Sequence, residues 1–201
     1  WADQIMVLVS QLGDSIVHIV LVISLLLWLM AKRHYLAAGH LLAAALFAVL
    51  MSWLLKQTVQ LPRPNAMFDG TMAFSFPSAH VVYACCSFGF LAVLIARELK
   101  PQQRWFCYAT AMLLILSIAF SRLYLGAHWF SDVAAGLILG LTWVVVLGVA
   151  YNRHLTSPIK PLGLITVPIL VLVLVGGWPR INSHEQKMQR YALQKHEIQL
   201  D

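Results

Sequence analysis

The sequence predicts an all-α integral membrane protein, a bundle of six transmembrane helices with its functional site at helix ends on one membrane face. Two observations support this prediction. Hydrophobic residues make up 60% of the 201 residues and charged residues only 11%, and the mean hydropathy of +0.76 is far above that of soluble domains. The apolar residues also gather in runs long enough to cross a bilayer as helices of about 20 residues. Because these runs are apolar all round rather than alternating, a membrane β-barrel is disfavoured.

Six runs have the length and composition of spans: residues 15–31, 36–55, 79–96, 105–120, 132–151 and 159–178. Residues 1–14 are weakly amphipathic and predict an interfacial helix that anchors the first span. Residues 1–178 are thus expected to form one membrane domain. Residues 179–201 are polar and mixed in charge, which indicates a surface tail or a linker. Within the fifth run, Gly136 and Gly140 form a pair of small residues typical of close helix packing.

The positions of the basic residues predict how the chain is oriented. One set of turns joins spans on a face we call side B, and it carries Lys32, Arg33, Arg97, Lys100, Arg104, Arg153 and Lys160. Cytoplasmic loops are enriched in Lys and Arg, so side B is predicted to be cytoplasmic. The formal net charge of +6 is therefore interpreted as a topological signal and not as a nucleic-acid surface. The opposite face, side A, is expected to face the periplasm or the cell exterior.

Polar residues from distant parts of the sequence converge on side A: Lys56, Arg63, Ser78, His80, Arg122, His128 and Asp132. If a helix begins near His128, that residue and Asp132 lie on one face, where the carboxylate can hold the imidazole in one tautomer. Ser78 is expected to cap the third span. The free N–H groups of that helix's first turn, beginning at Ala79, then face any nearby anion.

This set of residues fits phosphoryl transfer from a lipid phosphate. The three cations would neutralise the equatorial oxygens, and His128 would attack phosphorus while Asp132 keeps the attacking nitrogen unprotonated. His80 would protonate the leaving oxygen and then activate water. No metal and no other cofactor is expected, because lysine and arginine supply the charge that Mg²⁺ supplies elsewhere.

Three motifs in this chain resemble those of the type 2 phosphatidic acid phosphatase (PAP2) superfamily, and specifically its bacterial integral-membrane lipid phosphatases. Lys56 is followed after six residues by Arg63-Pro64, and the segment 77–80, Pro-Ser-Ala-His, is similar to the family's Pro-Ser-Gly-His. In the third motif five residues separate Arg122 from His128, and three residues separate His128 from Asp132. Both the order and the spacing of the motifs agree with the family pattern.

The resemblance implies the roles already argued: phosphate binding by Lys56, Arg63, Ser78 and Arg122, an acid role for His80, and a nucleophile at His128 oriented by Asp132. One residue departs from the pattern, because Ala79 stands where the family has glycine. A helical backbone accepts alanine, so we expect activity to survive with a changed pocket size.

The resemblance also implies a class of substrates and a location. The candidate substrates are undecaprenyl pyrophosphate, phosphatidylglycerol phosphate, phosphatidic acid and related lipid phosphates, and the location is the bacterial inner membrane. The chain starts at Trp1 and resembles a version fused behind a DedA-like membrane domain, so a fused or neighbouring membrane domain is an expected partner. Two alternatives stay open, namely a lipid-linked phosphotransferase and a non-catalytic lipid-binding or transport module.

Overall fold

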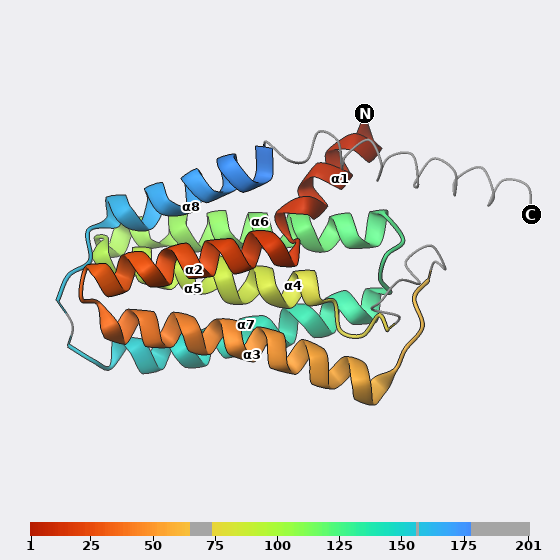
Figure 1. The fold of residues 1–201 in the computed structure, drawn as a ribbon, viewed down its shortest axis with the longest axis horizontal. Coiled ribbons are helices and arrows are strands. Elements are labelled where there is room, and N and C mark those ends of the chain that lie inside the picture. The colour runs from red at the N-terminus through yellow and green to blue at the C-terminus, as the bar shows by residue number, and fades with distance from the viewer. Residues whose placement is uncertain (65–73, 156, 178–201) are drawn as a thin grey trace, which may run out of the picture.

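The computed structural model describes residues 1–64, 74–155 and 157–177 of the chain, with no side-chain detail at Gly176 and Gly177. These residues form ten helical elements in chain order: α1 Ala2–Leu12, α2 Ser15–Ala31, α3 Tyr35–Val59, α4 Ala79–Ala84, the π-helix η2 Cys85–Gly89, α5 Phe90–Glu98, the 3₁₀ helix η3 Pro101–Gln103, α6 Arg104–Tyr124, α7 Phe130–Asn152 and α8 Pro161–Gly177. The long helices run side by side along the molecule (Figure 1). The tail predicted at 179–201 lies outside the described residues.

The all-helical prediction is confirmed, and each of the six predicted runs coincides with a helix. Among the described residues, four helices are long and apolar enough to span a membrane: Tyr35–Val59, Ala79–Glu98, Pro101–Tyr124 and Phe130–Asn152. The pair α1 and α2, bent by 41° at its break, would make a fifth span if it crosses as one unit. The apolar part of α8, Pro161–Val175, is shorter. The structure therefore supports four or five spans, and six spans stay a prediction.

The continuous helix Ala79–Glu98, made of α4, η2 and α5, is the centre of the bundle. Within its apolar window 78% of residues are buried, against 28–33% for the other three candidate spans. Those outer helices expose large apolar side chains such as Leu46, Leu113 and Ile138. In water such a surface would be unfavourable, whereas lipid tails solvate it.

Gly136 and Gly140 let α7 pack directly against the central helix, as their spacing predicts. A Cβ atom added at Gly140 would lie 2.5 Å from the Cβ of Cys85, and one at Gly136 would lie 3.1 Å from the carbonyl oxygen of Ser78. Side chains at these two positions would therefore push α7 away from α4 and η2. This close approach sets the distance between Ser78 and the start of α7.

We expect Gly140→Ala to destabilise the fold, because the new methyl group cannot fit beside Cys85. Overpacking of this kind costs about 1–3 kcal/mol. The matched control is Gly39→Ala, since a Cβ there meets nothing within 4 Å and alanine favours a helix interior. Thermal unfolding in detergent is expected to show a lower Tm for Gly140→Ala only. Equal Tm values for the two variants would contradict this account of the packing.

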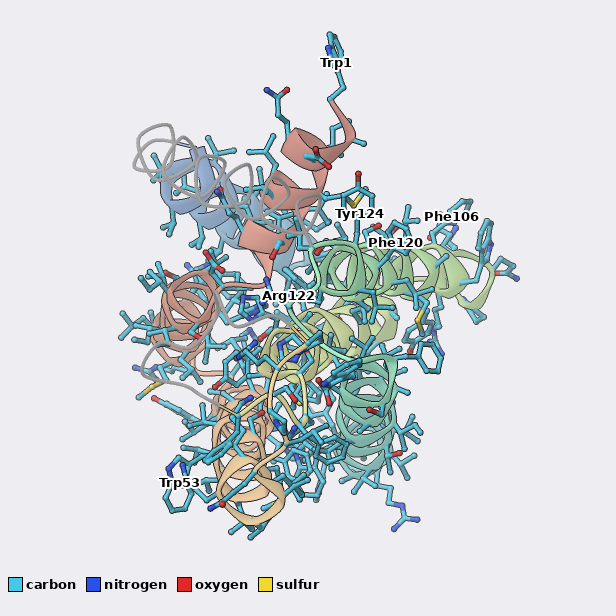
Figure 2. The ribbon with its side chains drawn as sticks, turned by 90° about the vertical axis from the view of Figure 1, so that its right-hand side faces the viewer. Trp1, Trp53, Phe106, Phe120, Arg122 and Tyr124 are labelled. Atoms are coloured by element: carbon cyan, nitrogen blue, oxygen red, sulfur yellow. The ribbon has the colours of Figure 1, made fainter. Side chains whose placement is uncertain are left out.

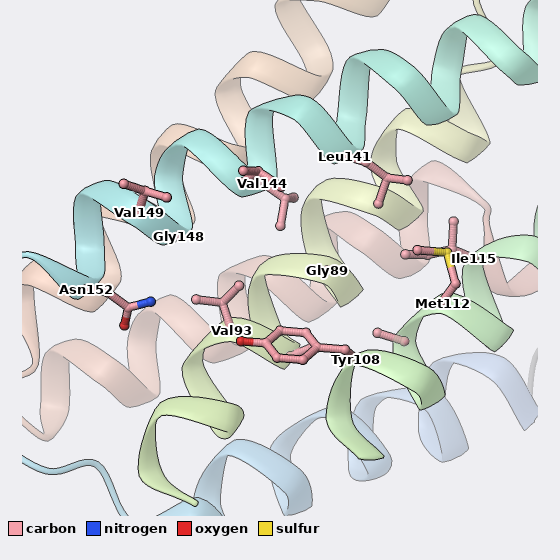
Figure 3. A pocket seen from close by; sticks show the side chains of 13 residues that line it. Gly89, Val93, Tyr108, Met112, Ile115, Leu141, Val144, Gly148, Val149 and Asn152 are labelled. Carbon is pink, nitrogen blue, oxygen red and sulfur yellow. The ribbon is translucent and has the colours of Figure 1, made fainter. Parts of the chain in front are cut away.

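A groove of about 350 Å³ opens between the central helix, α6 and α7 (Figure 3). Its lining is mainly apolar, with Val93, Met112 and Val144 among the side chains and with Tyr108 and Asn152 as polar members. None of the residues predicted to form the site borders this groove. The polar cluster is therefore a separate feature, at one end of the bundle.

Candidate active site

The predicted site residues meet at one end of the bundle, on the right in Figure 1, where α3 and α6 end and where α4 and α7 begin. The bend between α1 and α2 lies at the same end. Figure 2 views the molecule from this end, with Arg122 among the helices and with Trp1, Trp53 and Phe106 at the periphery. Segments far apart in the sequence thus deliver their polar residues to one place.

His128 and Asp132 are bonded to each other, although the local structure differs from the prediction. The helix α7 begins at Phe130, so His128 precedes it and the two residues do not share a helical face. Instead the carboxylate of Asp132 reaches back over the helix start. Its Oδ2 accepts a hydrogen bond from the backbone N–H of Trp129 at 2.9 Å and lies 3.2 Å from Nδ1 of His128. The same acid therefore caps the helix and orients the imidazole.

The contacts of His128 define its tautomer. Because Asp132 can only accept, Nδ1 of His128 carries the hydrogen. Nε2 lies 3.4 Å from Nη1 of Arg63, which only donates, so Nε2 holds a lone pair. Burial lowers the pKa of His128 to about 4, with the hydrogen bond to Asp132 opposing this shift and the positive charges of Arg122, Arg63 and Lys56 adding to it. At neutral pH the ring is uncharged, with Nε2 available to react.

Lys56 lies in the last turn of α3 and is buried. Its Nζ donates to the carbonyl oxygens of Phe74 at 2.7 Å and of Ser75 at 3.2 Å. These bonds attach Phe74 and Ser75 to the end of α3. Phe74 also forms an isolated antiparallel bridge with Pro62, which follows α3. An ammonium group has three donors, so the two bonds to Phe74 and Ser75 leave one donor for a ligand.

Arg63, which follows Pro62, donates from Nη1 to the carbonyl oxygen of Ala127 at 2.9 Å.

Ser78 occupies the N-cap position of α4, but the side-chain cap that we predicted is wrong. Its hydroxyl makes no capping bond, and Oγ is buried without a hydrogen-bond partner among the residues described. The backbone of Ser78 is bound to α7 instead, because its N–H donates to the carbonyl oxygen of Asp132 at 3.0 Å. The next residue, Ala79, is the first of the helix, and a right-handed helical backbone tolerates its methyl group.

Two partners at this end were not predicted from the sequence, and both come from the N-terminal segment. Nε2 of His80 lies 3.0 Å from Oδ1 of Asp14, and Nη1 of Arg122 donates to Oγ of Ser10 at 2.5 Å. The sequence analysis assigned residues 1–14 to anchoring alone. The sequence did contain one signal for such a contact. Asp14 stands at the border of an apolar run, and charged groups at membrane depth seldom lack a partner.

The site has an excess of positive charge. Lys56, Arg63 and Arg122 lie within electrostatic range of one another, and Lys56 and Arg122 are 6% and 7% exposed. The carboxylates that act on them are Asp132 and Asp14. Buried cations are costly unless opposite charge balances them, so a bound anion would complement this cluster.

Several known proteins are similar in sequence to this chain. The sequence profile of the PAP2 superfamily matches residues 36–155, which contain the seven polar residues predicted to form the site. The lipid phosphate phosphatase delta of Arabidopsis thaliana is 31% identical over 108 residues, which cover 47% of this chain but only 25% of the plant protein. The undecaprenyl-diphosphatase of Sulfolobus acidocaldarius is 28% identical over 163 residues, covering 78% of this chain and 72% of that protein.

A solved structure has the same fold. It is the transmembrane PAP2-type phosphatidylglycerolphosphate phosphatase of Bacillus subtilis, with a TM-score of 0.60 and 23% sequence identity, and the match covers 77% of this chain and 79% of that one. Both sequence relatives are named as phosphatases, which supports a phosphoric ester or anhydride hydrolase. Because the family profile covers more than half of the sequence, the chain belongs to the PAP2 superfamily.

Proposed function

We propose that this chain is a metal-independent lipid phosphatase that works through a phosphohistidine on His128. The observation that carries the proposal is the lone pair on Nε2 of His128, held beside Arg63 by the bond between Nδ1 and Asp132. A neutral imidazole that is fixed in one tautomer and surrounded by cations is suited to attack a phosphorus atom that carries negative oxygens.

The reaction would proceed in two displacements. First, Nε2 of His128 forms a bond to phosphorus while the bond to the leaving oxygen breaks, and His80 gives that oxygen its proton. Water then attacks the phosphohistidine, passing a proton to His80 as the nitrogen–phosphorus bond breaks and inorganic phosphate leaves. His128 is neutral again and His80 is protonated again, so the cycle closes without a metal.

The remaining residues would bind the phosphoryl group. Lys56, Arg63 and Arg122 bring three positive charges to its oxygens. The unpartnered hydroxyl of Ser78 and the first N–H groups of the central helix, starting at Ala79, would donate further hydrogen bonds. These donors would stabilise the charge that builds up on the equatorial oxygens during transfer.

Two features favour a lipid phosphate as the substrate. The cations lie at the ends of apolar helices, at the depth expected for headgroups, and the relatives are named for lipid-borne phosphates. Undecaprenyl pyrophosphate is our first candidate, followed by phosphatidylglycerol phosphate and phosphatidic acid. The basic turns on side B favour a multi-pass protein of the bacterial inner membrane whose site faces the periplasm.

The direct test is phosphate release from these three lipids in detergent with EDTA present. We expect the parent protein to release phosphate from at least one of them, and EDTA to change the rate less than about twofold, because cationic side chains replace the metal. A product that forms only when a phosphate acceptor is added would identify a phosphotransferase. A folded parent that is inactive on all three lipids, with and without acceptors, would overturn the proposal and favour a binding module.

The pH profile of kcat/KM provides a second test, because it reports the ionisation of the free enzyme. Since the pKa of His128 lies near 4, its Nε2 stays unprotonated as pH falls from 7 to 5, where an ordinary histidine would gain its proton. We therefore expect more than about half of the neutral-pH kcat/KM to remain at pH 5.5, once the ionisation of the substrate phosphate is taken into account. A loss of activity on the acidic side with a midpoint near pH 6.5 would contradict this environment for His128 if it persists when each of the other histidines is replaced.

A further inference from the structure

The break between α1 and α2 brings a carboxylate into contact with the second histidine of the site. Oδ1 of Asp14 lies 3.0 Å from Nε2 of His80, and the two side chains are 25% and 21% exposed. Asp14 stands at the N-cap position of α2, yet its side chain makes no capping hydrogen bond there. An aspartate at this position commonly bonds to the first N–H groups of the helix. Here the carboxylate contacts His80 instead.

The surrounding packing brings this pair together. A Cβ atom added at Gly13 would lie 2.8 Å from Cγ2 of Ile118 and 3.1 Å from Cδ2 of His80, so only glycine allows the break to approach the ring this closely. Two polar contacts hold α1 to the end of α6: Ser10 with Arg122, and Asp3 with Tyr124 at 2.7 Å. The N-terminal helix is therefore fixed against the site at several points along its length.

The charges around His80 explain why such a partner matters. Arg122 is a buried cation at the same end of the bundle, and Asp14 is the carboxylate in contact with the His80 ring. An acid that must hold a proton among cations needs a nearby anion to stabilise it. In this structure Asp14 supplies that anion.

We propose that Asp14 is a positioning residue that holds His80 as the proton donor of the reaction, an inference that rests on the proposed function. Nε2–H of His80 donates to Asp14, which leaves Nδ1–H to pass its proton to the leaving oxygen as the phosphorus–oxygen bond breaks. In the second displacement the lone pair of Nδ1 takes a proton from the attacking water. The site thus contains two histidine–aspartate pairs, one for the nucleophile and one for the acid.

The test uses the full chain with the variant Asp14→Asn, which keeps the size of the side chain and removes its charge. An acid matters most for a poor leaving group, so two substrates are compared in a single turnover: an alkyl lipid phosphate and p-nitrophenyl phosphate, whose leaving group needs no proton. We expect release from the lipid to fall about 10–100-fold and the burst of nitrophenolate to change less than about threefold. The alkaline limb of the lipid reaction is expected to move to lower pH, and Asp14→Glu to recover part of the rate.

The matched control is Asp3→Asn, on the same helix, with its carboxylate bonded to Tyr124 and outside the catalytic set. The amide oxygen of asparagine can still accept the hydrogen bond from the Tyr124 hydroxyl, so the rates and Tm of this variant are expected to equal those of the parent within experimental error. Equal losses on both substrates for Asp14→Asn would mean that Asp14 only supports the fold, and an unchanged or faster lipid reaction would show that His80 does not need it. Either result would overturn this inference while leaving the phosphatase proposal intact, whereas an inactive parent would overturn the phosphatase proposal itself.

Discussion

Replacing His128 with alanine is expected to reduce phosphate release from the preferred lipid by about 10⁴-fold or more. The reason is that Nε2 of His128 is the group held unprotonated beside the cationic cluster, and alanine leaves nothing to form the covalent intermediate. The same variant is expected to lose the labelled protein band that forms when the parent reacts with ³²P-lipid and is quenched in alkali, in which phosphohistidine survives. The rate and the label are measured on the same protein preparations.

A matched control is available at the opposite end of the bundle. His154 lies in the turn after α7, where its backbone oxygen accepts a hydrogen bond from Arg97, a contact that His154→Ala preserves. That variant is expected to keep both the rate and the labelled band. If His128→Ala released phosphate at the parent's rate while remaining folded, the nucleophile would have to be another group. Loss of activity with an unchanged labelled band would mean that His128 serves only the second displacement.

The sequence was sufficient to predict the helices and the residues that they bring together. Helix ends on one side of a bundle are adjacent in space, so Lys56, Arg122 and Asp132 could be placed together without knowing how the helices pack. The spacing of the motifs then distinguished these residues from the other polar residues at helix ends. The small residues of α7 were predictable in the same way, because Gly136 recurs with Gly140 on one helical face.

Contacts that depend on how the chain bends could not be predicted from spacing. The turn at Gly13 directs Asp14 toward His80, and no periodic pattern encodes a bend of 41°. The start of α7 was misplaced for a related reason. Its first helical residue is set by the bond from Asp132 back to the N–H of Trp129, and the spacing of His128 and Asp132 alone did not reveal that bond.

Helix length also limited what could be concluded about the spans. The apolar stretch of α8 and the bent pair α1 and α2 are both as hydrophobic as the longer spans, yet composition alone does not distinguish a short span from a helix lying across the bundle. This distinction decides on which side of the membrane each terminus lies. The position of the site does not depend on it, because α3, the central helix, α6 and α7 each qualify as spans by themselves.

Asp132→Asn is expected to reduce kcat by roughly 10²–10⁴-fold while leaving the fold intact. One carboxylate oxygen, Oδ2, now accepts from both Nδ1 of His128 and the N–H of Trp129. An amide oxygen in its place can keep both hydrogen bonds but carries no negative charge. The variant therefore loses the anion that stabilises the positive charge forming on the His128 ring as Nε2 bonds to phosphorus, without any change in the shape of the site.

Two measurements separate this effect from a loss of stability. Because asparagine still accepts the Trp129 N–H, we expect the Tm of the variant to lie within a few degrees of the parent's, while the rate at which the ³²P-labelled intermediate forms falls by the same factor as kcat. Parallel falls would show that the negative charge of Asp132 acts on the first displacement by stabilising the positive His128 ring. An intermediate that forms at the parent's rate but decays slowly would instead assign Asp132 to the hydrolysis step and contradict this account.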